Sequence, residues 1–177
     1  EMLRSLIERG ILAREGTAWK VTGLLQTIQV PDTLQGVLLS RLDRLPEPTK
    51  SVVQKAPVIG RVFLYRVLRH MAQADDELES KIALLEDAEL VRERSRLPEV
   101  EYVFKHALTQ EVAYKTLLSP ARKLLHQNVG RAMEAIYSER LEEFTGILAF
   151  HYFCGEDWEK ALEYSTRAGD RASQLYG

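Results

Sequence analysis

A mainly α-helical fold with two small β-hairpins is predicted by three features of the sequence. Apolar residues recur every three or four positions along most of the 177 residues, as they do on the buried face of a helix. Two short stretches, at 11–21 and 90–104, read instead as paired strands joined by polar turns. Near the end of the chain, small residues follow the spacing of a helix-turn-helix repeat.

The composition is that of an ordinary globular protein able to bury a core, with 45% apolar and 28% charged residues. No apolar run approaches the ~20 residues that a membrane helix needs, and the first residues, EMLRSLIERG, do not read as a signal peptide. The net charge of −2 predicts no general attraction to nucleic acid or anionic lipid. The single cysteine, Cys154, fits a reducing compartment. We therefore expect a cytoplasmic protein without membrane contact.

The first 30 residues read as a helix followed by a hairpin. An amphipathic helix is predicted over Glu1–Arg9, with Gly10 as its stop, and the strands Ile11–Arg14 and Ala18–Val21 follow. Since a domain seldom opens on Glu in the middle of a helix, we interpret the chain as a piece of a longer protein. Residues 1–30 would then be the end of a unit that lies upstream.

Four helices are predicted between residues 31 and 88. The first opens at Pro31 and Asp32. Pro46 and Pro48 separate it from the second helix, because Pro fits the first turn of a helix and cannot continue the one before. The second helix ends at Gly60, and two more cover 62–71 and 75–88. The inward side chains of the first helix are expected to be Leu34, Val37, Leu38, Leu42 and Leu45.

A second hairpin follows, with strands over 90–94 and 101–104 joined by a polar loop. Two apolar residues, Glu, a small residue and then Arg-Glu occur in this order both at 6–15 and at 84–93. A helix that ends at a small residue and passes into a two-stranded hairpin is typical of a winged-helix unit meeting its wing. Residues 31–118 are therefore predicted to form a helical arm and a winged-helix domain, whereas the first copy has too few helices before it.

The rest of the chain is predicted to be helical. Ser119 followed by Pro120 starts a helix, since Ser caps a helix and Pro fits its first turn. This helix makes up most of a connector over 119–140, and two further helices cover 141–154 and 158–175.

Those last two helices carry small residues where a tetratricopeptide repeat needs them. Ala149, Ala161 and Ala168 fall at the repeat positions where two helices cross closely, and larger side chains would not fit there. Residues 141–177 thus read as the first repeat of a tetratricopeptide-like α-solenoid. One such repeat cannot bury its face alone, so neighbouring repeats are expected.

Motifs of catalysis are missing from the sequence. Neither G-x-x-x-x-G-K-[ST] nor G-x-G-x-x-G occurs, so we expect no phosphate-cradling loop, no catalytic residue and no cofactor in these residues alone. His151 and Cys154 lie one helical turn apart and could share a metal ion, but two ligands without partners favour simple packing. We therefore predict no metal site. His70 and His126 lie among basic residues and are expected to face solvent.

DNA binding is the usual question for a winged helix, whose reading helix precedes the wing. Here that helix runs DDELESKIALLEDAE, with seven acidic residues against one lysine, and would repel phosphate. The wing itself is basic, with Arg92, Arg94 and Arg96. Binding of nucleic acid is therefore disfavoured by the helix and favoured only by the wing.

The stretch VFKHALTQEVAY combines residue types of acid–base chemistry at a predicted strand-to-helix junction. His106 lies there, where free helix N–H groups attract anions, although a histidine in such a place is more often a cap or a core residue. Gln110 and Glu111 are expected on the exposed side of the helix. The inward residues would be Leu108, Val112 and Leu117. The spacing indicates no catalytic triad.

Four stretches, in this order, resemble the region after the nucleotide-binding core of large bacterial STAND-type ATPases: VPDTLQGVLLSRLDRLP, KAPVIGRVF, YVFKHALTQEVAYKTLL and GEDWEKALEYSTRAGDRA. The resemblance covers nearly the whole chain, and the first and third stretches are specific as a pair. Proteins of this family often carry a class III adenylate or guanylate cyclase domain before this region and tetratricopeptide repeats after it. Others carry kinases or transcription regulators.

The resemblance implies that the winged helix folds over ADP held by the upstream core. In that family a histidine at the end of the wing, in a Met-His-Asp motif, contacts the ADP phosphate, and His106 falls at its position. Lys105 falls at the Met position and Ala107 at the Asp position, so the sequence keeps only the His and a following Leu108. The parent protein would hold ATP or ADP with Mg. A hydrogen bond from the imidazole to the phosphate would then favour a closed state.

These observations predict a regulatory relay between a nucleotide-switched signalling ATPase and a protein-binding solenoid, with cyclic-nucleotide synthesis as one output. Its partners would be the upstream core, the following repeats and a protein ligand of those repeats. Two alternatives remain: a DNA-binding transcription regulator, and a passive protein–protein scaffold.

Overall fold

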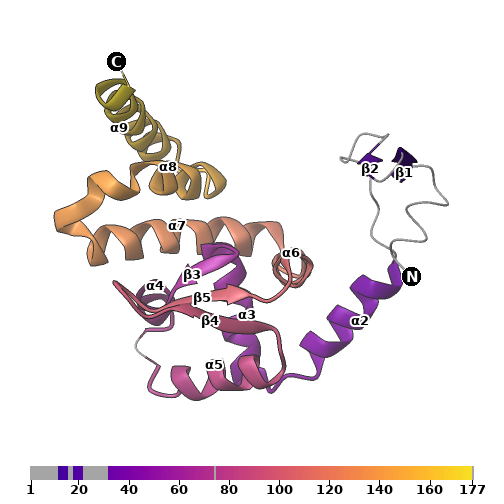
Figure 1. Cartoon of the computed structure of the whole chain (residues 1–177). Coiled ribbons are helices and arrows are strands. Elements are labelled where there is room, and N and C mark those ends of the chain that lie inside the picture. Colours follow the sequence, from indigo (N-terminus) through magenta and orange to yellow (C-terminus); the bar gives the residue numbers. More distant parts are fainter. Residues whose placement is uncertain (1–11, 16–17, 22–31, 74, 177) are drawn as a thin grey trace. The chain divides into compact units, whose positions relative to one another are not determined.

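A computed structural model describes residues 12–15, 18–21, 32–73 and 75–176, with side chains for 34–73 and 75–174 (Figure 1). These residues are mainly helical, with one three-stranded sheet and one two-stranded hairpin. The predicted mainly α-helical fold class is confirmed at this level. The chain divides into two compact units, Glu1–Leu34 and Gln35–Gly177.

The first unit contains the predicted hairpin. Strand β1 (Leu12–Glu15) and strand β2 (Ala18–Val21) pair antiparallel, with Leu12 opposite Val21. The helix predicted over Glu1–Arg9 lies outside the described residues.

Helix α2 (Asp32–Asp43) buries a narrower apolar stripe than the sequence predicted. Leu38 and Leu42 are buried, as is Leu45 just after the helix. The prediction is wrong for Leu34 and Val37, whose side chains are 36% and 56% exposed. Val37 lies about 100° around the helix from Leu38 and so points away from the core. Leu34 lies one turn before Leu38, on the same face but outside the core. Only the residues spaced at i, i+4 and i+7 from Leu38 reach the core.

A strand replaces the first turn of the helix predicted over 62–71. Helix α3 (Glu47–Ile59) is followed by strand β3 (Val62–Leu64), and helix α4 (Tyr65–Met71) begins only then. Strand β3 pairs with a strand far along the chain, β5 (Glu101–Phe104). The sequence pattern could not reveal β3 because three residues are too few to show a strand period, and distant pairing decides their conformation.

The second predicted hairpin is confirmed and completes the three-stranded sheet. Helix α5 covers Leu78–Asp87, later than the predicted start at residue 75, and leads into strand β4 (Val91–Ser95). Strands β4 and β5 pair antiparallel, and β5 also pairs antiparallel with β3, so the order across the sheet is β3-β5-β4. In Figure 1 this sheet lies between α5 and the later helix α7 (Ser119–Ile136).

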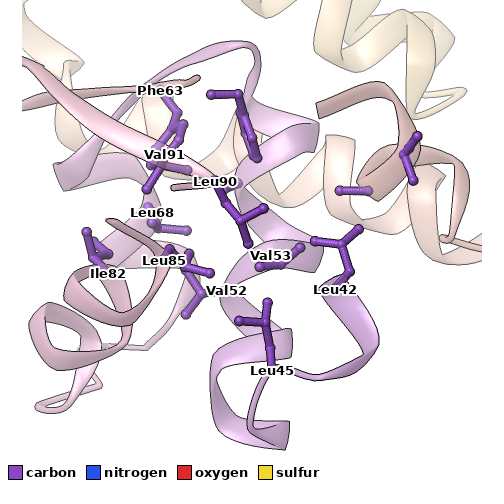
Figure 2. Close-up of a cluster of buried hydrophobic side chains, with 14 of the residues drawn as sticks. Leu42, Leu45, Val52, Val53, Phe63, Leu68, Ile82, Leu85, Leu90 and Val91 are labelled. Carbon is purple, nitrogen blue, oxygen red and sulfur yellow. The ribbon is translucent and has the colours of Figure 1, made fainter. Parts of the chain in front are cut away.

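Helices α2 to α5 and the sheet enclose a core of aliphatic and aromatic side chains (Figure 2). The Phe63 ring lies 5.8 Å from the Tyr102 ring and 5.6 Å from the Phe104 ring, centroid to centroid. Lys81 is buried on α5, and its Nζ pairs with Asp75 Oδ2 at 2.6 Å. The core side chains labelled in Figure 2 are Leu42, Leu45, Val52, Val53, Phe63, Leu68, Ile82, Leu85, Leu90 and Val91.

The remaining elements are helices, as predicted, with one difference. They are α6 (Ala107–Lys115), α7, the 3-10 helix η2 (Ser138–Phe144), α8 (Thr145–Cys154) and α9 (Trp158–Tyr176). The helix predicted from residue 141 begins at Thr145. Residues 138–144 form the 3-10 helix η2 instead, and Phe144, with φ −112° and ψ 4°, separates it from α8.

A second core joins α7, α8 and α9. The two helices α7 and α8 approach closely at Gly130, where an added Cβ would lie 2.6 Å from the ring of Tyr152. The rings of Tyr152 and Tyr164 stack with centroids 5.7 Å apart, and so connect α8 to α9. The buried members of this core are Val58, Val67, Leu117, Val129, Ala132, Met133, Tyr137, Leu148, Tyr152, Ala161 and Tyr164.

Polar contacts tie the helices of this second core together. Glu134 of α7 accepts hydrogen bonds from Lys160 Nζ and Tyr164 Oη of α9, each at 2.7 Å. Burial opposes ionisation of Glu134, yet these donors outweigh it and hold the pKa of its carboxyl below the ordinary value. Tyr137 Oη donates to Glu99 at 2.7 Å, which ties α7 to the loop between β4 and β5. Among the described residues, no helix is long and apolar enough to span a membrane.

Candidate functional site

His106 lies at the junction of strand β5 and helix α6, where the sequence predicted it. It occupies the N-cap position of α6 with an extended backbone (φ −125°, ψ 136°). Its carbonyl oxygen accepts the N–H of Thr109 at 3.1 Å, but its imidazole makes no capping hydrogen bond to that helix. The side chain is exposed. Neither of the two structural alternatives, a capping role or a core role, therefore accounts for the imidazole of His106.

The surroundings of His106 are rich in cationic side chains. Lys105 Nζ lies 2.7 Å from Glu89 Oε1, and Arg41 Nη2 of α2 donates to the carbonyl oxygen of Ala88 at 2.6 Å. The hydrogen bond and charge of Lys105 lower the pKa of the Glu89 carboxyl below its ordinary value, and the nearby Arg41 and His106 act in the same direction. The turn between α5 and β4 is thus bordered by positive charge.

Most of the polar residues after His106 have structural roles. Gln110 Nε2 donates to the carbonyl oxygen of Pro57 at 2.9 Å, and so is only partly exposed, contrary to the prediction. Glu111 is exposed and pairs with Lys115 at 2.6 Å. Thr109 is buried. Among the residues predicted to face inward, Val112 and Leu117 are buried and Leu108 is partly buried against the first core. The stretch VFKHALTQEVAY therefore leaves His106 as its available functional side chain.

A buried histidine pair lies between α7 and α8. His126 Nδ1 and His151 Nδ1 are 3.0 Å apart, and Tyr114 Oη is 3.0 Å from His126 Nε2. The prediction that His126 faces solvent is wrong, since both imidazoles are buried. Burial lowers the pKa of His126 to about 4, with help from the charge of Arg122, and burial together with His126 lowers the pKa of His151 to about 3. Two neutral imidazoles can share one N–H···N hydrogen bond.

The sequence did contain a signal for the burial of His126. His126, Val129, Gly130 and Met133 fall at i, i+3, i+4 and i+7, the spacing of one helical face. All four are buried. The neighbouring Arg122 and Lys123 suggested an exposed face, but both are themselves partly buried beside His126.

The two possible metal ligands His151 and Cys154 have no third ligand beside them in the described residues. His151 turns to His126, while Cys154 is only partly buried and burial raises the pKa of its thiol. No group of three or more His, Cys, Asp or Glu side chains that could hold a metal ion is found in the described portion of the chain. The remaining histidine outside the proposed site, His70, is exposed as predicted.

The surface of α5 is acidic once the helix is folded. Its single lysine, Lys81, is buried and paired with Asp75, so it adds no charge to the surface. The exposed carboxylates of the segment 75–89 are Asp76, Glu77, Glu79, Glu86, Asp87 and Glu89.

Two of the three arginines on the β4–β5 hairpin are paired with carboxylates. Arg94 pairs with Glu101 at 3.3 Å, and Arg96 pairs with Glu93 at 2.7 Å. Arg92 is exposed. Together with the acidic α5, these pairs leave little positive surface for nucleic-acid phosphates on α5 and the β4–β5 hairpin.

Comparison of the chain with models of protein families, with curated protein sequences and with solved structures finds no match in any of the three.

Proposed function

We propose that this chain is the regulatory part of a nucleotide-switched signalling ATPase, in which a winged helix senses nucleotide and passes its state to a helical repeat. The topology supports the winged helix. Helix α3, strand β3, helices α4 and α5 and strands β4 and β5 follow the order of that fold, with the third strand between the other two. The hairpin β4–β5 then corresponds to the wing, and α5 to the helix before it.

The proposal rests on the imidazole of His106 at the end of the wing. This imidazole is exposed and makes no capping hydrogen bond to α6. An imidazole donates a hydrogen bond to a phosphate oxygen, and the first N–H groups of α6 add a favourable dipole. No P-loop motif occurs in these residues, so the nucleotide would be held by an ATPase core elsewhere in the polypeptide, with Mg. His106 would bridge that core to the winged helix in the ADP state.

Helices α8 and α9 support a tetratricopeptide-like pair. Leu148 and Ala161 are buried between them, as the repeat pattern requires, and Tyr152 stacks on Tyr164. Ala168 is partly buried further along α9. The α8–α9 pair would begin a solenoid that binds a protein ligand.

A continuous set of contacts joins the junction to this pair. Helix α6 contacts α7 through Tyr114 and His126. Helix α7 contacts α8 at Gly130 and Tyr152, and contacts α9 through Glu134. A shift of α6 on nucleotide exchange would therefore alter the packing of the α8–α9 pair. Such coupling is what a relay needs.

The test is the ADP affinity of the longer protein that contains the ATPase core. His106→Ala is expected to weaken ADP binding about tenfold, because a charge-assisted hydrogen bond is lost. His70→Ala is the matched control, since His70 is also an exposed histidine but lies on α4. Equal ADP affinity of the wild type and the His106 variant would refute the proposal.

Each of the two rival functions can be tested by a separate observation. A DNA-binding regulator would bind duplex DNA at low salt, where even non-specific binding is detectable by fluorescence anisotropy. A passive scaffold needs no ATPase core, so the absence of G-x-x-x-x-G-K-[ST] from the complete parent sequence would favour it. The acidic α5 and the paired arginines of the wing argue against the first rival.

A further inference from the structure

Three basic side chains from two separate parts of the sequence lie near one short turn. Arg41 comes from α2 and binds the carbonyl oxygen of Ala88 at 2.6 Å. Lys105 follows β5 and pairs with Glu89 at 2.7 Å, while its backbone N–H donates to Leu90 at 3.0 Å. His106 is the next residue. The turn Ala88–Leu90 is thus held from α2 on one side and from the β5–α6 junction on the other.

Glu89 is an unusual residue for its place in this turn. It follows the C-cap of α5 with φ 56°, in the left-handed region that favours glycine. Its side chain is 66% exposed and reaches Lys105, which is 38% exposed. The charges of Arg41 and His106 also act on this exposed carboxylate, which lowers the net positive charge of the surface that it shares with Lys105.

We propose that Arg41, Lys105 and His106 form one binding surface for the terminal phosphates of a nucleotide, and that Glu89 occupies it as an internal anion when phosphate is absent. The inference rests on the proposed function, because it takes the nucleotide phosphate to reach His106. It adds two phosphate contacts, from Arg41 and Lys105, and a competing group, the Glu89 carboxylate.

The energetics of the Glu89–Lys105 pair suit such an exchange. An exposed ion pair contributes little to stability, since water solvates both groups well. A diphosphate carries more charge than one carboxylate and offers several acceptor oxygens, so it can engage Arg41, Lys105 and His106 together. The ligand would displace Glu89 from Lys105 and leave the fold intact.

Replacement of the Glu89 carboxylate by a phosphate would also affect α2. Arg41 has one guanidinium to share between the Ala88 carbonyl and a phosphate, so binding would loosen or reorient the contact of α2 with the turn. Helix α2 joins the two compact units along the chain. Phosphate binding would in this way be linked to the segment that leads back to the first unit.

The test is to titrate the 177-residue chain with inorganic pyrophosphate at low ionic strength and to measure the affinity by isothermal titration calorimetry. Glu89→Gln is expected to bind pyrophosphate about three- to tenfold more tightly than the wild type, because the competing carboxylate is gone. Lys105→Gln and Arg41→Gln are each expected to bind about three- to tenfold more weakly.

The chain supplies a matched control in Glu156. This residue also follows a helix with φ 56°, and its Oε1 pairs with Lys123 at 2.7 Å, but its pair lies at the turn between α8 and α9. Glu156→Gln is expected to leave pyrophosphate affinity unchanged. Equal gains for the Glu89 and Glu156 variants would overturn the proposal, and so would equal competition by sulfate at matched ionic strength.

The outcomes separate this inference from the proposed function. If His106→Ala weakens ADP binding in the longer protein while Glu89→Gln, Lys105→Gln and Arg41→Gln leave pyrophosphate affinity unchanged, the inference is wrong and the function stands. If those three variants change pyrophosphate affinity as expected while His106→Ala leaves ADP affinity unchanged, the nucleotide-sensing function is wrong. The surface would then bind free polyphosphate only, and its assignment to a nucleotide would be overturned.

Discussion

The two cores of the second unit differ in the kinds of side chain that they bury. The core around the sheet is aliphatic and aromatic, and its buried charge, Lys81, is paired with Asp75. The core of α7, α8 and α9 contains buried imidazoles and has a half-buried carboxylate at its edge. Apolar packing tolerates changes of pH, whereas a buried polar network depends on the protonation of its members. The region that would bind nucleotide thus packs on an apolar core, and the region that would transmit the signal is held together by polar contacts as well.

The largest effect is expected in the apolar core. Phe104→Ala should lower the free energy of unfolding by about 4 kcal/mol, because it removes a buried ring and leaves a cavity. Urea denaturation measures the loss, which should be the same at neutral and mildly acidic pH. Phe153→Ala is the control, since the Phe153 ring is 61% exposed and its loss should cost at most about 0.5 kcal/mol. A pH-dependent penalty for Phe104→Ala would contradict the contrast between the cores.

The second prediction is acid sensitivity of the helical core. The pKa values of His126 and His151 in the fold are about 4 and about 3, below the ordinary value of 6.5. The unfolded chain therefore binds protons below about pH 6.5 while the fold does not, so stability is complete above that pH and falls as the pH falls towards 4. By pH 4 each of the two histidines should contribute roughly 3 kcal/mol to this loss.

The source of this loss can be isolated with variants. The groups that face the pair are Tyr114 from α6, Arg122 from α7 and Phe150 from α8, and Arg122 adds a positive charge that opposes protonation. His151→Leu should flatten the fall of stability between neutral pH and pH 4, and His70→Asn should not. The same slope in both variants would exclude the buried pair as its cause.

The smallest predicted effects concern the close approach of α7 and α8. Gly130→Ala should destabilise the fold by about 1–2 kcal/mol, since the added Cβ would meet the packed Tyr152 ring at 2.6 Å. Gly169→Ala is the matched change in an open part of α9, where no atom lies within 4 Å of the added Cβ. It should stabilise the fold by about 0.5–1 kcal/mol, as Ala favours a helix over Gly. Thermal unfolding of both variants would show whether the two signs are opposite.

The sequence predicted most helices and both hairpins, because their apolar periods and their Pro and Gly boundaries are local. It did not predict β3, whose three residues become a strand only by pairing with β5. It also placed Val37 in the core and His126 in solvent, the reverse of what is found. Both errors came from treating residue type or spacing alone, whereas burial depends on which face meets a neighbouring helix.

The position of His106 could be predicted, but its neighbours could not. The order of strand and helix was enough to place His106 at a helix start. Arg41 and Glu89 are far from it in sequence, and a contact between α2 and the end of α5 leaves no local pattern. The cationic surroundings of the site are therefore a result of the tertiary fold.

The most direct test of the central claim is amide hydrogen exchange at the start of α6, measured in the longer protein with and without ADP. If nucleotide reaches His106, the amides of residues 106–109 should exchange more slowly with ADP, and this protection should disappear in His106→Ala. Identical exchange at the α6 start with and without ADP would contradict the claim that this junction senses nucleotide.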